Sequence, residues 1–227
     1  DKATDAAGNN NTAATQATQA VDTAAPTTPT IAAITTPDND STPTITVTAE
    51  AGSTVKVYAN GDLLGTATNT SGTTHTLTPS ALPDGNYSIT AVATDATGNA
   101  SAEAVPQNII IDVVKDGVPV ISSASLTVDS TPVVSGTAEV GSTITAVIAG
   151  ATYTTTAADG TWSVDTGSAT PASGSLSVNA NGTNAVSVTA TDAAGNVSAA
   201  GTQTLTVDST APTVAITDDT GGTSAVN

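Results

Sequence analysis

Apolar and polar residues alternate along much of this chain of 227 residues. In residues 44–49, isoleucine and valine occupy one face and threonines the other, which predicts a half-buried β-strand. A second alternating segment ends at Asn60-Gly61, a pair that strongly favours a two-residue β-hairpin turn. The same alternation recurs over 87–93 and 186–190, where Ile, Val and Ala are expected on the inner faces. The pattern therefore predicts strands joined by tight turns.

No segment indicates a helix, and turn residues recur roughly every 8–12 positions. In the second half, Asp159-Gly160 is expected to be a hairpin turn that leads into a strand carrying Trp162. We therefore predict an all-β fold made of antiparallel β-sandwiches, each of roughly seven strands.

One short sequence recurs along the chain. Ala-Thr-Asp-Ala-Ala-Gly-Asn occupies residues 190–196, and copies of it occupy 93–99 and 3–9. Each copy is followed by a polar, extended segment that ends in an apolar residue and an aspartate. The aspartates inside the copies lie 90 and 97 residues apart, and the terminal aspartates lie 90 and 96 apart. Both sets of aspartates are thus spaced by nearly the same number of residues, which indicates tandem repeats.

The repeats divide the chain into four expected parts. The first is the C-terminal strand and loop of a preceding repeat, over residues 1–21. Two whole repeats follow, over 22–111 and 112–207, and residues 208–227 open another repeat. We therefore expect sandwiches arranged end to end, in a piece of a longer protein.

The chain is strongly acidic, with a formal net charge of −17 from 20 acidic and 3 basic residues. Nucleic acid and anionic membrane surfaces are therefore excluded as expected partners, because both attract basic proteins. No apolar run reaches transmembrane length, and the N-terminal residues lack the pattern of a signal peptide. Cysteine, phenylalanine and methionine are absent, so a thin core must close without disulfides. A bound metal is the expected additional support.

The predicted strand order brings carboxylates together at one pole of each repeat. The first aspartate of the repeat, the turn after the second strand and the loop before the last strand should all lie at this pole. These residues are Asp22, Glu50 and Asp95 in the first repeat, and Asp112, Glu139 and Asp192 in the second.

The turn after the first strand should lie at the opposite pole. In the first repeat it carries Asp38, Asn39 and Asp40, expected to face the acids of the second repeat. Asp129 is the counterpart in the second repeat, and it should face Asp208, Asp218 or Asp219.

Clustered carboxylates repel one another unless a cation neutralises them. Oxygen ligands without His or Cys select Ca²⁺, which accepts six to eight oxygens in irregular geometry. We therefore expect calcium to stiffen the connections between repeats, at the roughly 10⁻⁴–10⁻³ M affinity of extracellular modules. The alternative is that each aspartate only forms a turn by bonding its own backbone. That alternative is preferred for Asp62, Asp84, Asp159 and Asp165.

Nothing in the sequence indicates catalysis. His75 is the only histidine and is expected on the surface, and no serine lies in a Gly-x-Ser-x-Gly motif. Trp162 is expected in the core, although a lone tryptophan is also able to serve as a ligand platform. We therefore predict that the chain is not an enzyme.

Three motifs together resemble the bacterial immunoglobulin-like repeats of giant surface adhesins and biofilm-associated proteins, which are usually exported by type I secretion. They are Asp-Ser-Thr-Ala-Pro-Thr at 208–213, Ala-Thr-Asp-Ala-Ala-Gly-Asn at 190–196 and Ala-Glu-Val-Gly-Ser-Thr at 138–143. The resemblance implies immunoglobulin-like sandwiches outside the cell, with calcium where repeats meet. The sequence after Asp112 departs from the usual one, because it places Lys115 near the expected metal and leaves Asp116 to compensate.

The resulting expectation is a stalk segment whose partners are neighbouring repeats of the same chain. It would hold a distal domain that binds host or bacterial surfaces, for adhesion or biofilm formation. One alternative is a ligand-binding module for glycan, ice or another cell's adhesin, recognisable by threonine ladders on a sheet face. Others are a spacer in a secreted polysaccharide-degrading enzyme and a disordered stalk, the last weakened by the regular alternation.

Overall fold

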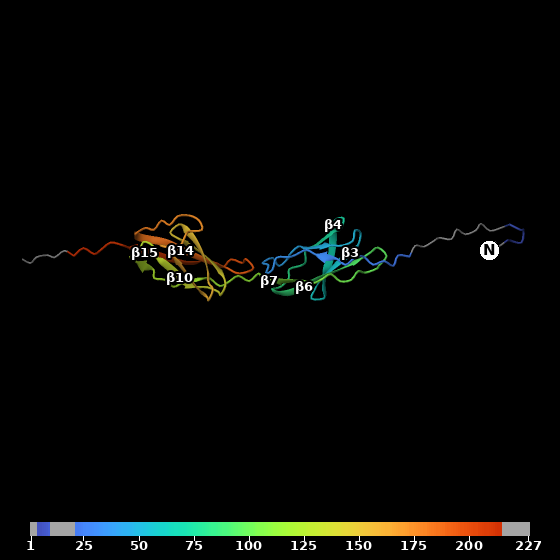
Figure 1. Cartoon of the computed structure of the whole chain (residues 1–227), viewed down its shortest axis with the longest axis horizontal. Coiled ribbons are helices and arrows are strands. Elements are labelled where there is room, and N and C mark those ends of the chain that lie inside the picture. The colour runs from blue at the N-terminus through green and yellow to red at the C-terminus, as the bar shows by residue number, and fades with distance from the viewer. Residues whose placement is uncertain (1–3, 10–20, 215–227) are drawn as a thin grey trace, which may run out of the picture. The chain divides into compact units, whose positions relative to one another are not determined.

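The computed structural model describes residues 4–9 and 21–214. Within these residues every regular element is a β-strand, which confirms the predicted all-β class (Figure 1). No helix able to cross a membrane occurs among them. Their contacts form two compact units. Of the described residues, the first takes in 4–9, 21–34, 44–80 and 87–108, and the second takes in 109–214 with the short segments 35–43 and 81–86.

Seven strands make up the first sheet, in the order β1-β2-β5-β4-β3-β6-β7. Their bounds are β1 Thr30–Ile31, β2 Ile45–Thr48, β3 Thr54–Ala59, β4 Asp62–Ser71, β5 Thr74–Leu77, β6 Gly85–Thr94 and β7 Gln107–Ile111. The long strand β4 pairs with β3 through its first half and with β5 through its second half. One continuous strand thus connects the β1-β2-β5 part to the β3-β6-β7 part.

The predicted hairpin between β3 and β4 is confirmed. β3 ends at Ala59 and β4 begins at Asp62, so Asn60 and Gly61 form the whole turn. Their φ angles are 52° and 89°, in the left-handed region that a two-residue hairpin turn requires. Asparagine and glycine tolerate this region better than other residues do, which explains why the sequence signal was reliable.

Eight further strands form two sheets, β13-β10-β8 and β12-β11-β14-β15-β9. Their bounds are β8 Val120–Ile121, β9 Leu126–Thr127, β10 Val133–Thr137, β11 Thr143–Ile148, β12 Ala151–Thr156, β13 Thr161–Asp165, β14 Asn181–Thr191 and β15 Gly201–Asp208. All pairings among them are antiparallel except that of β15 with β9, which is parallel.

The predicted hairpin at Asp159-Gly160 is wrong. β12 pairs with β11, whereas β13 pairs with β10 in the other sheet. Residues 157–160 therefore carry the chain from one sheet to the other instead of reversing it within one. Sequence alone did not reveal the difference, because Asp-Gly suits a crossing turn as well as a hairpin.

The core of the second sandwich consists mainly of Val, Ile, Leu and Ala, together with Tyr153 and Trp162. Trp162 is only 3% exposed, which confirms its predicted place in the core. It lies opposite Gly136 across β10 and β13. A Cβ on Gly136 would come within 2.8 Å of Trp162 Cζ2, so glycine leaves the space that the indole fills.

The prediction that His75 lies on the surface is wrong, because His75 is 1% exposed. It occupies an inward position of β5, opposite the fully buried Val47 of β2. Its Nε2 lies 3.2 Å from Ser53 O and 3.1 Å from Asn69 Nδ2, and its Nδ1 lies 3.2 Å from Thr73 O. These contacts satisfy a buried polar ring, so His75 is part of the core.

Candidate metal-binding pole

The recurring Asp-x-x-Gly-Asn sequence folds into the same turn wherever it occurs. In the loop after β6, Asn99 N donates to Asp95 Oδ1 at 2.9 Å and Asn99 Nδ2 donates to Asp95 Oδ2 at 2.8 Å. Asn196 bonds Asp192 at 2.9 Å and 2.8 Å in the same way, in the loop after β14. The third copy, Asp5 to Asn9, has these bonds too, at 2.9 Å and 3.0 Å. The turn is therefore encoded locally.

These hydrogen bonds favour the ionised carboxylate. The bonds from Asn99, assisted by Thr97 and opposed by slight desolvation, lower the pKa of Asp95 to about 2. At Asp192, burial opposes ionisation, but the bonds from Asn196 and the neighbouring backbone outweigh it and lower the pKa. The side chain and backbone of Asn9 lower the pKa of Asp5. All three carboxylates are thus held as anions.

The strand register brings the predicted acids to one pole of each sandwich. Thr54 pairs with Thr94, which places the turn holding Glu50 next to the loop that begins at Asp95. Asp22 reaches the same loop, because its carbonyl oxygen lies 3.2 Å from Asn99 Nδ2. These three residues therefore lie at one pole, as the strand order predicted.

The same pairing recurs in the second sandwich. Thr143 pairs with Thr191, so the turn holding Glu139 adjoins the loop that begins at Asp192. Asn196 Nδ2 reaches the carbonyl oxygen of Asp112 at 2.8 Å. Asp112, the turn holding Glu139 and the loop that begins at Asp192 therefore lie at one pole of the second repeat as well.

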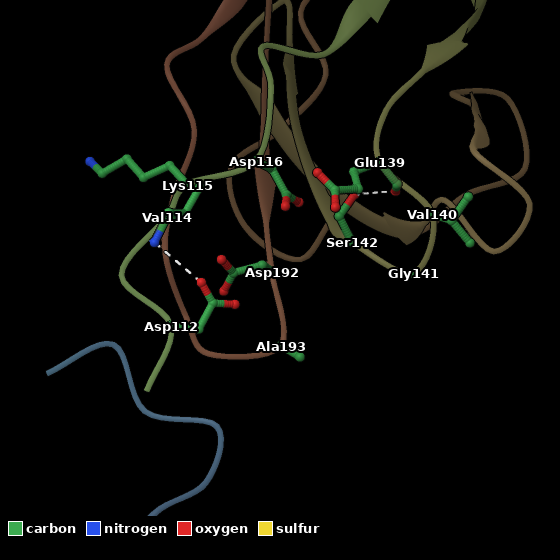
Figure 2. Close-up of a pocket in the computed structure, with 10 residues that line it drawn as sticks. All are labelled: Asp112, Val114, Lys115, Asp116, Glu139, Val140, Gly141, Ser142, Asp192 and Ala193. Atoms are coloured by element: carbon green, nitrogen blue, oxygen red, sulfur yellow. Dashed lines mark hydrogen bonds between the residues drawn. The ribbon is translucent and has the colours of Figure 1, made fainter. Parts of the chain in front are cut away.

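At this second pole the acids line a cavity of about 340 Å³ (Figure 2). Asp112, Asp116, Glu139 and Asp192 direct their carboxylates toward the same space, whereas the side chain of Lys115 extends away from them. No basic side chain is therefore seen to neutralise the four carboxylates in this view.

Asp116 is not one of the predicted ligands, although the sequence leaves it to compensate for Lys115. Burial raises the pKa of Asp116, and the nearby charges of Glu139, Asp192 and Asp112 raise it further. Its Oδ2 is buried without a hydrogen-bond partner. A buried oxygen surrounded by like charges is an unfavourable arrangement that a cation would relieve.

The donor set fits calcium, since it consists of hard carboxylate oxygens with no sulfur or imidazole. Asp112, Asp116, Glu139 and Asp192 would hold the ion, and backbone carbonyls and water would complete its shell. In the described part of the chain, however, no three acidic, His or Cys side chains are grouped tightly enough to form a metal site as they stand. The four carboxylates line one cavity without forming a closed ligand shell. Calcium binding stays a prediction.

The remaining predicted ligands form local turns. Asp38 Oδ1 accepts Asp40 N, Asp40 Oδ1 accepts Thr42, and Asp129 Oδ1 accepts Thr131. Asp38 also accepts the Asp112 N–H at its carbonyl oxygen, at 2.9 Å, so its turn adjoins the start of the second repeat.

At the far end, Asp208 Oδ1 accepts Thr210 N at 3.0 Å, and Asp208 lines a cavity with Leu126 and Val128. Asp129 does not line that cavity. Asp218 and Asp219 lie outside the described residues.

In the described residues, both compact units consist of β-strands around buried aliphatic side chains, so this is an all-β protein. Residues 33–113 match the model of the family described as the bacterial Ig-like domain. No curated protein matches the chain in sequence.

Several solved structures are similar to the chain. Fibronectin(III)-like modules of Clostridium thermocellum CbhA share 17% identity over 79% of this chain and 94% of theirs, with a TM-score of 0.46. The BSP domain of a biofilm-associated protein shares 22% identity over 82% of this chain and 30% of that structure, with a TM-score of 0.29. A family 28 exopolygalacturonase of Yersinia enterocolitica shares 16% identity over 42% of this chain and 21% of its own, with a TM-score of 0.28.

Proposed function

We propose that this chain is a stalk segment of a bacterial cell-surface adhesin. Its immunoglobulin-like units follow one another in tandem, calcium stiffens them, and they project a distal binding domain away from the cell. The observation that supports this proposal is the pole at which Asp112, Asp116, Glu139 and Asp192 surround one cavity. The function is reach and stiffness, with no chemistry of its own.

The charge distribution explains why calcium would act as a stiffener. The cavity is bordered by the segment that opens the second repeat, which contributes Asp112 and Asp116, and by two loops of the sandwich, which contribute Glu139 and Asp192. A cation bound to both groups would tie that opening segment to the sandwich. It would stabilise the folded state by mass action, because the unfolded chain lacks the site.

Small-angle scattering with a parallel thermal melt tests this proposal, first in millimolar calcium and then with a chelator. We expect calcium to lengthen and stiffen the particle and to raise its melting temperature. At a calcium concentration 100 times the dissociation constant, the gain would be about 2.7 kcal/mol. If calcium changes neither quantity, the acids are ordinary turn residues and the calcium-stiffened stalk is wrong.

A second candidate function is ligand binding by a sheet face. Thr145 of β11 lies between Thr154 of β12 and Thr189 of β14. Two residues earlier on β11, Thr143 lies between Thr156 and Thr191 on the same face. All are exposed or half-buried. Such ladders are the feature expected of a binding face, whereas Trp162 is too buried to serve as a platform. A glycan array probed with this chain, and with a Thr145→Val variant, would test the idea.

A further inference from the structure

The asparagine that closes each turn also holds the segment that opens the same repeat. Asn196 Nδ2 donates to the carbonyl oxygen of Asp112 at 2.8 Å and lies 3.4 Å from that of Val114. It bonds Asp192 Oδ2 at the same time. A side-chain amide has two N–H groups, so one serves the aspartate and the other is shared by the two carbonyls. Asn196 is 7% exposed, which protects these bonds from water.

The first repeat has the same arrangement. Asn99 Nδ2 lies 3.2 Å from Asp22 O and 3.3 Å from Ala24 O. The acceptors are again the first aspartate of the repeat and the residue two positions later. Asn99 Nδ2 also donates to Thr97 Oγ1 at 2.9 Å, a bond that Asn196 lacks, but both asparagines contact the same two carbonyl positions of their repeat.

The segment at 112–114 is held from its other side through its N–H groups. Val113 N donates to Asp84 Oδ1 at 3.0 Å, and Asp112 N donates to Asp38 O at 2.9 Å. A corresponding bond follows β15, where Ser209 N donates to Asn181 Oδ1 at 3.1 Å. Asp84 was expected to be a plain turn residue, but its carboxylate also positions the chain after β7.

We propose that Asn99 and Asn196 are positioning residues that fix the opening segment of each repeat without any metal. Each asparagine joins its Asp-x-x-Gly-Asn turn to two carbonyls of that segment, so the segment is already ordered when calcium is absent. The inference rests on the proposed stalk function, in which these segments connect successive units. Calcium would then bind beside a segment that hydrogen bonds already hold to its own unit.

Amide hydrogen exchange of the full chain, followed by NMR in chelator, tests this proposal. We expect Asn196→Ala to speed exchange of the Asp112 and Val113 amides by about three- to tenfold, the effect of losing a typical hydrogen bond. The amide of Val188, in the centre of β14, is the internal reference for the intact sandwich. Asn9→Ala removes the same side chain from the copy at 5–9 and should leave all three amides unchanged.

A second variant keeps the test valid if Asn196→Ala also speeds exchange at Val188. Asn99→Ala, measured at the Ala24 amide, repeats the experiment in the first repeat, where Ala24 N donates to Asp22 Oδ1 at 3.0 Å. Unchanged exchange in both opening segments would overturn the proposal. A failure of the calcium-stiffened stalk would appear separately, as wild-type scattering that does not respond to calcium.

Discussion

Asp95 and Asn99 are joined by two parallel hydrogen bonds, from the backbone N–H to Oδ1 at 2.9 Å and from the side-chain amide to Oδ2 at 2.8 Å. This pairing engages both carboxylate oxygens and needs an ionised Asp95 to be strong. The same relationship recurs between Asp192 and Asn196. The stability of each loop therefore depends on the charge state of one aspartate.

The first prediction concerns pH. The pKa of Asp95 falls from 3.8 to about 2 on folding. A depressed pKa stabilises the folded state above pH 3.8, and this contribution is lost as the pH falls through about 2. We expect the melting temperature of wild type to fall more steeply between these pH values than that of Asp95→Asn. A carboxyl NMR titration should give the pKa directly, and an ordinary value near 3.8 would contradict the hydrogen-bonded loop.

The second prediction concerns Asp116. Replacing it with asparagine removes one of four clustered charges, so we expect Asp116→Asn to be more stable than wild type in chelator. A gain of about 1 kcal/mol would raise the melting temperature by about 4–8 °C. Calcium affinity should fall about tenfold, because one ligand is lost. A thermal melt in chelator measures the stability and calorimetric titration measures the calcium affinity, with Asp62→Asn as the control outside the cavity. Lower stability in chelator together with unchanged calcium affinity would contradict the assignment.

The third prediction concerns Asp192. Asp192→Ala removes the carboxylate that accepts the backbone and side-chain bonds of Asn196, and with it one carboxylate of the cavity, so it should loosen the opening segment without unfolding the sandwich. We expect a cost of about 1–3 kcal/mol, measured by urea denaturation, and a clear loss of calcium affinity. Asp95→Ala should act in the same way on the first repeat. Asp165→Ala also removes a turn aspartate but lies outside the cavity, so its calcium affinity should match wild type. Unchanged scattering and affinity in Asp192→Ala would remove the basis for the metal site.

The fourth prediction concerns Gly136. A Cβ at this position would overlap the carbonyl oxygen of Val120 and press on Trp162 Cζ2. We therefore expect Gly136→Ala to destabilise the second sandwich by about 1–3 kcal/mol through overpacking. Gly117→Ala adds the same methyl group where no atom lies within 4 Å, so its stability should be close to wild type. Equal denaturation midpoints for the two variants would show that the indole is not packed against Gly136.

Local features were predictable from the sequence because short-range physics determines them. Asn60-Gly61 forms its hairpin turn because both residues accept a positive φ. The alternation around β2, β3, β6 and β14 correctly placed Ile45, Val57 and Val188 in the core, where they are fully buried.

Features that depend on distant partners were not predictable in the same way. His75 is polar by type, but its burial is decided by β2 across the sheet and by the carbonyl of Ser53. The destination of the chain after Asp159-Gly160 is decided by β10, which lies more than 20 residues earlier. Neither partner can be read from the local sequence.

The acidic pole contains residues that were predictable from the sequence and residues that were not. Its main carboxylates could be placed by topology, because loops at one end of a sandwich must converge. The roles of Asp116 and the asparagines do not follow from the local sequence. Asp116 acts through its buried oxygen, and the asparagines act through carbonyl oxygens more than 70 residues away. A signal for the asparagines was nonetheless present, because Asn closes every copy of the recurring sequence.

The parallel pairing of β9 with β15 has a mechanical consequence. These strands lie near the two ends of the β8–β15 segment, so a force that pulls the ends apart slides one strand along the other. In this shear geometry the hydrogen bonds must break together, whereas antiparallel terminal strands would peel apart one bond at a time. The parallel bridge between Asp38 and Ile111 repeats the arrangement before residue 112. Resistance to tension is a matter of unfolding rate, so a sandwich of modest equilibrium stability can still resist a pulling force.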